Sequence, residues 1–347
     1  MPGLYVPRDG LATGILFPVN RGATLLILLT TLSTGAAAAP LPLKLVRDVP
    51  LPGGPTRFDY QWVDEKGGRL YIAHLGADSV DVFDLRAGNV VGVVEGLPSV
   101  HGVVAVPERH VVLATVTAQK QLAIIDDRTL TVRARVPAGE YPNGLAFDPG
   151  TNRVFVSNNS GLGIAVVDLV QAKPLPGIDI GGGAGNSQYD SASGHIFVTV
   201  HKAAVLVEID PAAPKVIARH ELKGVRTCHG LLIAADLHLA FAACGSEAGP
   251  KLVTFDLAAG RQSSLQPIPA QVDVLAFDPG RRRLYVSSST GRIAVFEVTA
   301  DREVTNVGEG FVGPNAHTVS VDPQSHRVYF PLENLHGRAV LRIMEGP

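Results

Sequence analysis

Cysteine, methionine and tryptophan are scarce in this chain of 347 residues, which contains two, two and one of them. Two cysteines close at most one disulfide, so the chain is not a small disulfide-stabilised scaffold. Aromatic residues make up 6% of the sequence and the formal net charge is −2. With neither a net positive charge nor a basic patch in the sequence, there is no field to attract a polyphosphate, and nucleic acid is not an expected partner.

The apolar run near the N-terminus, residues 23–32, is too short for a membrane-spanning helix, which needs about 20 residues. Arg21 precedes it, and alanines follow at 36–39. A charge, a short apolar segment and small residues in this order are typical of a secretory signal peptide. We therefore expect a signal peptide over residues 1–38 and a mature chain over 39–347. The mature chain would be periplasmic or secreted, without membrane contact after cleavage.

Glycine and proline are abundant, with 37 and 25 copies, which disfavours long helices. Instead, one short strand motif recurs every 41 to 45 residues: a basic or polar residue, an aliphatic, an aromatic or small apolar residue, and another aliphatic. Its seven copies begin at Arg69, His110, Arg153, His195, His238, Arg283 and Arg327. A second apolar strand follows each copy, and in the first six units it ends at an acidic residue. The two strand motifs therefore recur together, with the same spacing along the chain.

A period near 43 residues with several short strands is typical of a propeller blade, a four-stranded sheet that buries its faces against its neighbours. We predict an all-β fold, a seven-bladed β-propeller of four-stranded antiparallel blades, as a single domain over 39–347. The seventh unit ends after its third strand. Residues 43–49 have no local partner, so we expect them to supply the missing outer strand and close the ring.

These repeats carry a resemblance to a known family. The strands Arg-Leu-Tyr-Ile and Arg-Val-Phe-Val-Ser-Asn and the connection Pro-Asn-Gly-Leu-Ala-Phe-Asp-Pro resemble those of exported YVTN-repeat propellers, the YncE-like proteins. The resemblance covers nearly all of residues 39–347 and implies the propeller fold. Relatives in the wider superfamily include lactonases, a streptogramin-type lyase and nitrous oxide reductase, so fold analogy alone selects no function.

Polar residues recur at one position of the predicted innermost strands, eleven or twelve residues before the third position of each first motif. The seven blades supply Asp59, His101, Asn143, Asn186, His229, Asp273 and His317. Innermost strands line the central channel of a propeller, so we expect these side chains to converge at its mouth in a shared, water-filled funnel. They are our candidate ligand-binding residues.

The residue types favour a ligand or a metal ion over plain solvation, because no serine, threonine or lysine occurs among the seven. His101, His229 and His317 are candidate metal ligands, and three histidines with two carboxylates suit zinc, copper or iron. The asparagines and aspartates alone would suit calcium or magnesium. Solvated residues that cap the inner strands are the plainer alternative.

The remaining polar candidates are the cysteines and one further histidine. Cys228 and Cys244 flank the turn at residues 235–236, so a hairpin would place them face to face, close enough for a disulfide. A free thiol beside His229, acting as ligand or nucleophile, is the alternative. His74 is a weaker candidate for reaching the same end of the channel as Asp59.

Two functions fit the sequence. The first is a monomeric binding protein that holds a small molecule, a metal or a partner protein at the funnel mouth. The second is a metal-dependent hydrolase or lyase, lactonase-like, in which His229, His317 and Asp273 are the catalytic candidates. The sequence leaves open whether the protein is an enzyme, and it names no substrate.

Overall fold

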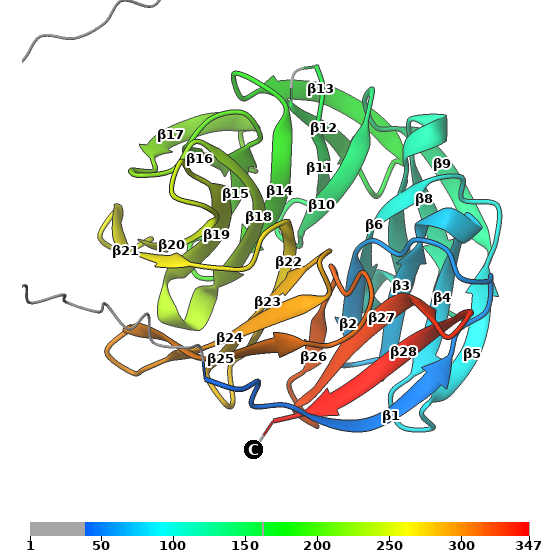
Figure 1. Cartoon of the computed structure of the whole chain (residues 1–347). Coiled ribbons are helices and arrows are strands. Elements are labelled where there is room, and N and C mark those ends of the chain that lie inside the picture. The colour runs from blue at the N-terminus through cyan, green and yellow to red at the C-terminus, as the bar shows by residue number, and fades with distance from the viewer. Residues whose placement is uncertain (1–38, 162, 347) are drawn as a thin grey trace, which may run out of the picture. The chain divides into compact units, whose positions relative to one another are not determined.

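The structure is a computed structural model that describes residues 39–161 and 163–346. The predicted signal peptide lies outside these residues. In the described part, seven four-stranded antiparallel sheets surround a central channel (Figure 1), which confirms the predicted seven-bladed propeller. None of the described helices is long and apolar enough to cross a membrane.

Six blades are built from consecutive strands that run from the channel outward. Blades 1 to 3 comprise β2 (Gln61–Asp64), β3 (Arg69–His74), β4 (Ser79–Asp84), β5 (Asn89–Val94); β6 (Val100–Val106), β7 (Val111–Val116), β8 (Gln121–Asp126), β9 (Val132–Pro137); and β10 (Pro142–Asp148), β11 (Arg153–Asn158), β12 (Gly163–Asp168), β13 (Lys173–Asp179). Blades 4 to 6 comprise β14 (Ala184–Asp190), β15 (His195–Val200), β16 (Val205–Asp210), β17 (Lys215–Glu221); β18 (Thr227–Ala234), β19 (Leu239–Gly245), β20 (Lys251–Asp256), β21 (Arg261–Pro267); and β22 (Val272–Asp278), β23 (Arg283–Ser288), β24 (Arg292–Val298), β25 (Val304–Phe311). Four 3₁₀ turns join strands at Leu75–Ala77, Pro107–Arg109, Thr117–Gln119 and Ala235–Leu237.

The seventh blade joins the two ends of the described chain. Its strands are β26 (Ser320–Asp322), β27 (Arg327–Leu335), β28 (Arg338–Glu345) and, outermost, β1 (Lys44–Pro50). β1 pairs antiparallel with β28, as predicted from residues 43–49. The Arg342 guanidinium holds both carboxylate oxygens of Asp48 across this pair, at 2.8 and 2.6 Å. The ring is therefore closed by an N-terminal strand, which covers the edge that β28 would otherwise expose.

Burial follows the position of each strand within its blade. Every residue of β7 is buried, because a middle strand is covered on both faces by neighbouring blades. The outer strand β17 alternates between exposed and half-buried residues. Buried apolar residues form seven clusters, each with members from two adjacent blades. The hydrophobic core is thus a ring of seven blade-to-blade interfaces around the channel.

Candidate functional site

The seven predicted positions lie where the innermost strands begin, at one end of the channel. In blades 2 to 6 the pairing of the inner strand with its neighbour shifts register at this point, for example between Val100 and Val103 around His101. A β-bulge redirects the side chain of the bulged residue. Asp59 and His317 instead lie just before β2 and β26. The chain therefore departs from regular pairing at every position where the polar residues occur.

Hydroxyl groups of one blade fix the backbone of these positions in the next. Thr199 Oγ1 donates to the carbonyl oxygen of His229 at 2.8 Å, and Ser287 Oγ donates to that of His317 at 2.7 Å. Thr115 makes the equivalent bond to Asn143. Each donor lies on the second strand of the preceding blade. The positions of the ring residues are thus set by their neighbours rather than by their own blade alone.

Three of the seven side chains form the centre of the site. One ligand atom each from Asp59, Asp273 and His317 lies within 4.8 Å of the others. His101 Nε2 is 4.0 Å from Asp59 Oδ2, and His229 Nε2 is 3.3 Å from Asp273 Oδ1. The structure therefore brings five of the seven residues into one cluster of carboxylates and imidazoles.

The other two predicted residues lie outside this cluster. Asn186 Oδ1 accepts a hydrogen bond from the Tyr60 hydroxyl, and the buried Oδ1 of Asn143 has no hydrogen-bond partner in the described part of the chain. His74 is fully buried behind the ring, stacked on Phe58 with ring centroids 4.0 Å apart. Its Nε2 lies 2.9 Å from the Thr56 hydroxyl and its Nδ1 3.3 Å from Asp81. His74 therefore supports the segment that carries Asp59, and it does not line the cavities at the ring.

The ring is more buried than the expected water-filled funnel. Asp59 and His317 are each 2% exposed, and His101, Asn143 and Asn186 are also buried. Only the side chains of His229 and Asp273 remain about a quarter and a fifth exposed, at 25% and 21%. The expectation of a water-filled funnel around all seven residues was wrong, because five of them are buried and make contacts with residues of other blades, such as His101 with Asp59 and Asn186 with Tyr60.

Burial and mutual charge shift the pKa values of the cluster. Burial, and next the neighbouring charge of Asp273, raise the pKa of Asp59 well above its usual value, although Arg57 opposes this. Burial would also raise the pKa of Asp273, but the hydrogen bond and charge of His229, with His317 and Arg57, outweigh it and hold that pKa below its usual value. The two carboxyls thus differ, and Asp273 is the one held as a carboxylate.

Two buried histidines of the ring, His101 and His317, are shifted toward the neutral form. Burial lowers the pKa of His101 and of His317. His101 Nδ1 donates to the Ser99 carbonyl at 2.9 Å, and His317 Nδ1 donates to that of Asn315 at 3.3 Å. In a neutral imidazole the other nitrogen then carries a lone pair. His317 Nε2 is buried and has no hydrogen-bond partner in the described residues.

Sequence reasoning missed Arg57, Tyr60 and His201. Arg57 Nη2 is 3.5 Å from Asp59 Oδ2, and His201 Nδ1 is 3.3 Å from His229 Nδ1. Arg57 lies two residues before Asp59, and His201 directly follows the second strand of blade 4. The residue types at these two positions differ from blade to blade, so the repeat did not indicate them. Tyr60 directly follows Asp59 in sequence, and that adjacency was the one available signal.

Two cavities open on the cluster. One of about 380 Å³ is lined by Arg57, Asp59, His101 and residues of blades 3, 5 and 6. Another of about 280 Å³ is lined by Arg57, His201, His229 and His317. Both contain Arg57, His229 and Asp273 in their walls. The cluster is therefore accessible to a small ligand, with a guanidinium beside it.

A disulfide joins Cys228 to Cys244 beside the ring. The two residues are direct partners in the pairing of β18 with β19, and their Cα atoms are 4.0 Å apart. A third cavity, of about 210 Å³, is lined by both cysteines, His201 and His229. The bridge thus fixes the strand that carries His229.

The fold and this ring define a seven-bladed β-propeller with a carboxylate and imidazole cluster at one end of its channel. No family model matches the chain, and no curated protein matches its sequence. Among solved structures, the chain is similar to the Kuenenia stuttgartiensis hydrazine synthase, with a TM-score of 0.71 and 14% identity. The match covers 84% of this chain and 96% of that one. At this identity the likeness shows the fold.

Proposed function

We propose that the protein is a binding protein whose ring holds a divalent transition-metal ion through Asp59, Asp273 and His317. The observation that carries this proposal is the buried, unpartnered His317 Nε2 in a cluster whose three ligand atoms lie within 4.8 Å of one another. Ligands 2.0 to 2.2 Å from one ion lie about 3 to 4.4 Å apart, so small rotations of the side chains complete the site.

The donor set favours zinc, iron or another ion of that group over calcium. One imidazole and two carboxylates, with His101 and His229 adjacent, combine nitrogen with oxygen, whereas calcium takes oxygen ligands only. Solvation of the rim does not explain the arrangement, because Asp59 and His317 are almost inaccessible to water. The cavities beside the cluster leave room for a small ligand on the ion.

The proposal also includes the family of the protein and its location in the cell. The repeats support membership of the YncE-like group, and the N-terminal charge, apolar run and alanines support export to the periplasm or the medium. A monomer with a small molecule or a partner protein at the ring face fits this setting. Separation of periplasmic from cytoplasmic material in an expressing bacterium tests the export.

Metal content tests the site. Protein purified without a metal-affinity tag, incubated with zinc, iron or manganese salts and desalted, should retain about one ion per chain by elemental analysis. The variant D273N/H317A should retain less than a tenth of that amount. N143A is the matched control, because Asn143 belongs to the ring but not to the cluster. Wild type that retains no ion and whose melting temperature is unchanged by these metals would refute the metal site.

One observation favours an enzyme as the second candidate. The partly exposed His229 lies 3.3 Å from Asp273, which can orient the imidazole, and it lines both ring cavities. His229 would then accept a proton from a substrate in a hydrolase or lyase reaction, with Asp273 and His317 as the other catalytic candidates. Turnover of a lactone and ester panel that is lost in H229A, while the metal is retained, would support the enzyme. If the wild type turns over no compound of the panel, the enzyme proposal loses its support and the binding protein is retained as the proposed function.

A further inference from the structure

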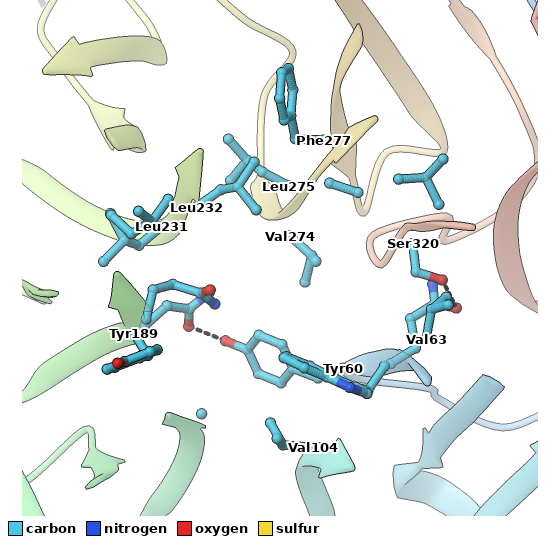
Figure 2. A pocket seen from close by; sticks show the side chains of 18 of the residues that line it. Tyr60, Val63, Val104, Tyr189, Leu231, Leu232, Val274, Leu275, Phe277 and Ser320 are labelled. Atoms are coloured by element: carbon cyan, nitrogen blue, oxygen red, sulfur yellow. Dashed lines mark hydrogen bonds between the residues drawn. The ribbon is translucent and has the colours of Figure 1, made fainter. Parts of the chain in front are cut away.

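The opposite end of the channel contains a larger cavity that shares none of the cluster residues. Its volume is about 690 Å³, and it is surrounded by the later residues of the seven inner strands (Figure 2). Tyr60 of blade 1 donates a hydrogen bond from its hydroxyl to Asn186 of blade 4, and both residues line this cavity; Figure 2 draws a dashed line from the Tyr60 hydroxyl. Tyr60 lines both this cavity and the ring cavity of about 380 Å³. Tyr60 therefore forms the partition between a polar end and an apolar end.

The walls of this cavity are mainly aliphatic, with four aromatic side chains among them. Leu231, Leu232, Val274 and Leu275 project around the channel (Figure 2). Tyr60, Trp62, Tyr189 and Phe277 are the aromatic members. Trp62 is 37% exposed and, with Tyr189, also lines an adjoining cavity of about 390 Å³. A concave, mostly apolar site of this size is typical of small-molecule pockets.

The charges around this cavity have one sign. Glu65 and Asp236 are in its wall, and no lysine, arginine or histidine is among its lining residues. Within residues 39–161 and 163–346, no ion pair includes Glu65 or Asp236. In the adjoining cavity the one basic residue, Lys66, is ion-paired with Glu108. The charged side chains that line the larger cavity are therefore both carboxylates.

We propose that this cavity binds a small organic cation with a flat apolar or aromatic body. Aromatic faces attract a cation through their quadrupole, most strongly tryptophan, and the apolar walls bury the body of the ligand. Glu65 and Asp236 at the mouth attract the charge and disfavour anions. The inference does not depend on a metal at the ring, because the two sites share no charged residue.

The single tryptophan of the chain reports on this site. The probe is (2-naphthylmethyl)trimethylammonium, compared with its neutral isostere 2-neopentylnaphthalene and the anion 2-naphthylmethanesulfonate. Each is titrated in low salt while Trp62 fluorescence is followed, and binding is confirmed by calorimetry. We expect saturable binding of the cation, weaker binding of the neutral compound and the weakest binding of the anion. Equal binding of all three, or none by the cation, would overturn the proposal.

Two variants and one control locate the site. E65Q/D236N should weaken binding of the cation about fivefold and leave the neutral compound unchanged, because it removes two exposed attractions. V274F should weaken both compounds, because it fills the channel. The ring variant H229A/H317A keeps Trp62 and should bind the cation as wild type does. Binding that is lost in the ring variant but kept in V274F would place the cation at the ring and refute this site.

Discussion

The hydroxyl of Tyr60, from blade 1, donates a hydrogen bond to the side-chain oxygen of Asn186, from blade 4, across the central channel. The two residues are 126 positions apart in sequence. This contact divides the channel into an end with carboxylates and imidazoles and an apolar end with a negative mouth. It also ties two non-adjacent blades together.

Removal of this contact should destabilise the protein. Y60F leaves the Asn186 side chain without its donor, and we expect the free energy of unfolding to fall by about 1 to 3 kcal/mol. Y141F is the control, because Tyr141 is 41% exposed, and it should change the value by less than about 0.5 kcal/mol. Denaturation in urea measures both. Equal stability of the two variants would show that the bond contributes nothing.

Ring closure depends on β1. Deletion of residues 1–51 removes this strand and exposes the edge of β28, so we expect aggregation or loss of folding. The matched control deletes only residues 1–38 and should fold. Circular dichroism and gel filtration compare the two proteins. A monomeric 1–51 deletion with an unchanged melting temperature would contradict the closure argument.

The cysteines should be oxidised in exported protein. Intact mass after alkylation should show no labelled thiol before reduction, because Cys228 and Cys244 form a disulfide. The bridge closes a loop with a sequence separation of 16, so C228S/C244S should lose about 3 kcal/mol of unfolding free energy. Two thiols labelled under native, non-reducing conditions would be incompatible with the bridge.

The histidines should make the metal-free protein sensitive to acid. Because burial lowers the pKa of His101 and His317, the unfolded chain binds more protons than the folded one between the lowered values and about 6.5. Unfolding free energy should therefore fall as the pH drops through this window. Asp59, with its raised pKa, contributes the opposite slope above about 3.8.

Comparison with H101N/H317N isolates the histidines, since Asp59 contributes to both proteins. The variant should show a smaller loss of stability between about pH 7 and pH 5 in urea titrations with a chelator. H110N, on an exposed hairpin turn, is the control and should follow wild type. If the unfolding free energy of H101N/H317N depends on pH as steeply as that of the wild type, the acid sensitivity does not come from these two histidines.

Single alanine variants should separate the two histidines nearest Asp273. H229A removes a partly exposed ring and should cost within about 1 kcal/mol. H317A removes a buried ring that is 2% exposed and leaves a cavity, so we expect about 2 kcal/mol or more in the metal-free protein. Thermal or urea unfolding with a chelator checks the order. A larger loss of stability in H229A than in H317A would mean that the exposure of the two side chains does not determine how much each contributes to stability.

The repeat in the sequence determined the fold. Strand motifs at 41 to 45 residues specify seven similar sheets, and sheets of this kind bury their faces only against one another. The missing fourth strand of the last unit and the unpaired residues 43–49 determined the closure. An exposed sheet edge has unpaired backbone groups that tend to pair with another chain, so a strand of the same chain covers it. Both features depend on local patterns, which a sequence displays directly.

The sequence also placed the seven polar residues at one level of the channel, since equivalent positions in repeats occupy equivalent places. Only the tertiary structure decided how they differ. Asp59 and His317, just before regular strands, are buried, whereas His229 at a bulge stays partly exposed, and Asn186 bonds to Tyr60 instead of joining the cluster. Arg57 and His201 join the cluster at positions where the residue type differs from blade to blade. Contacts across the axis depend on the closed ring, and no local pattern encodes them.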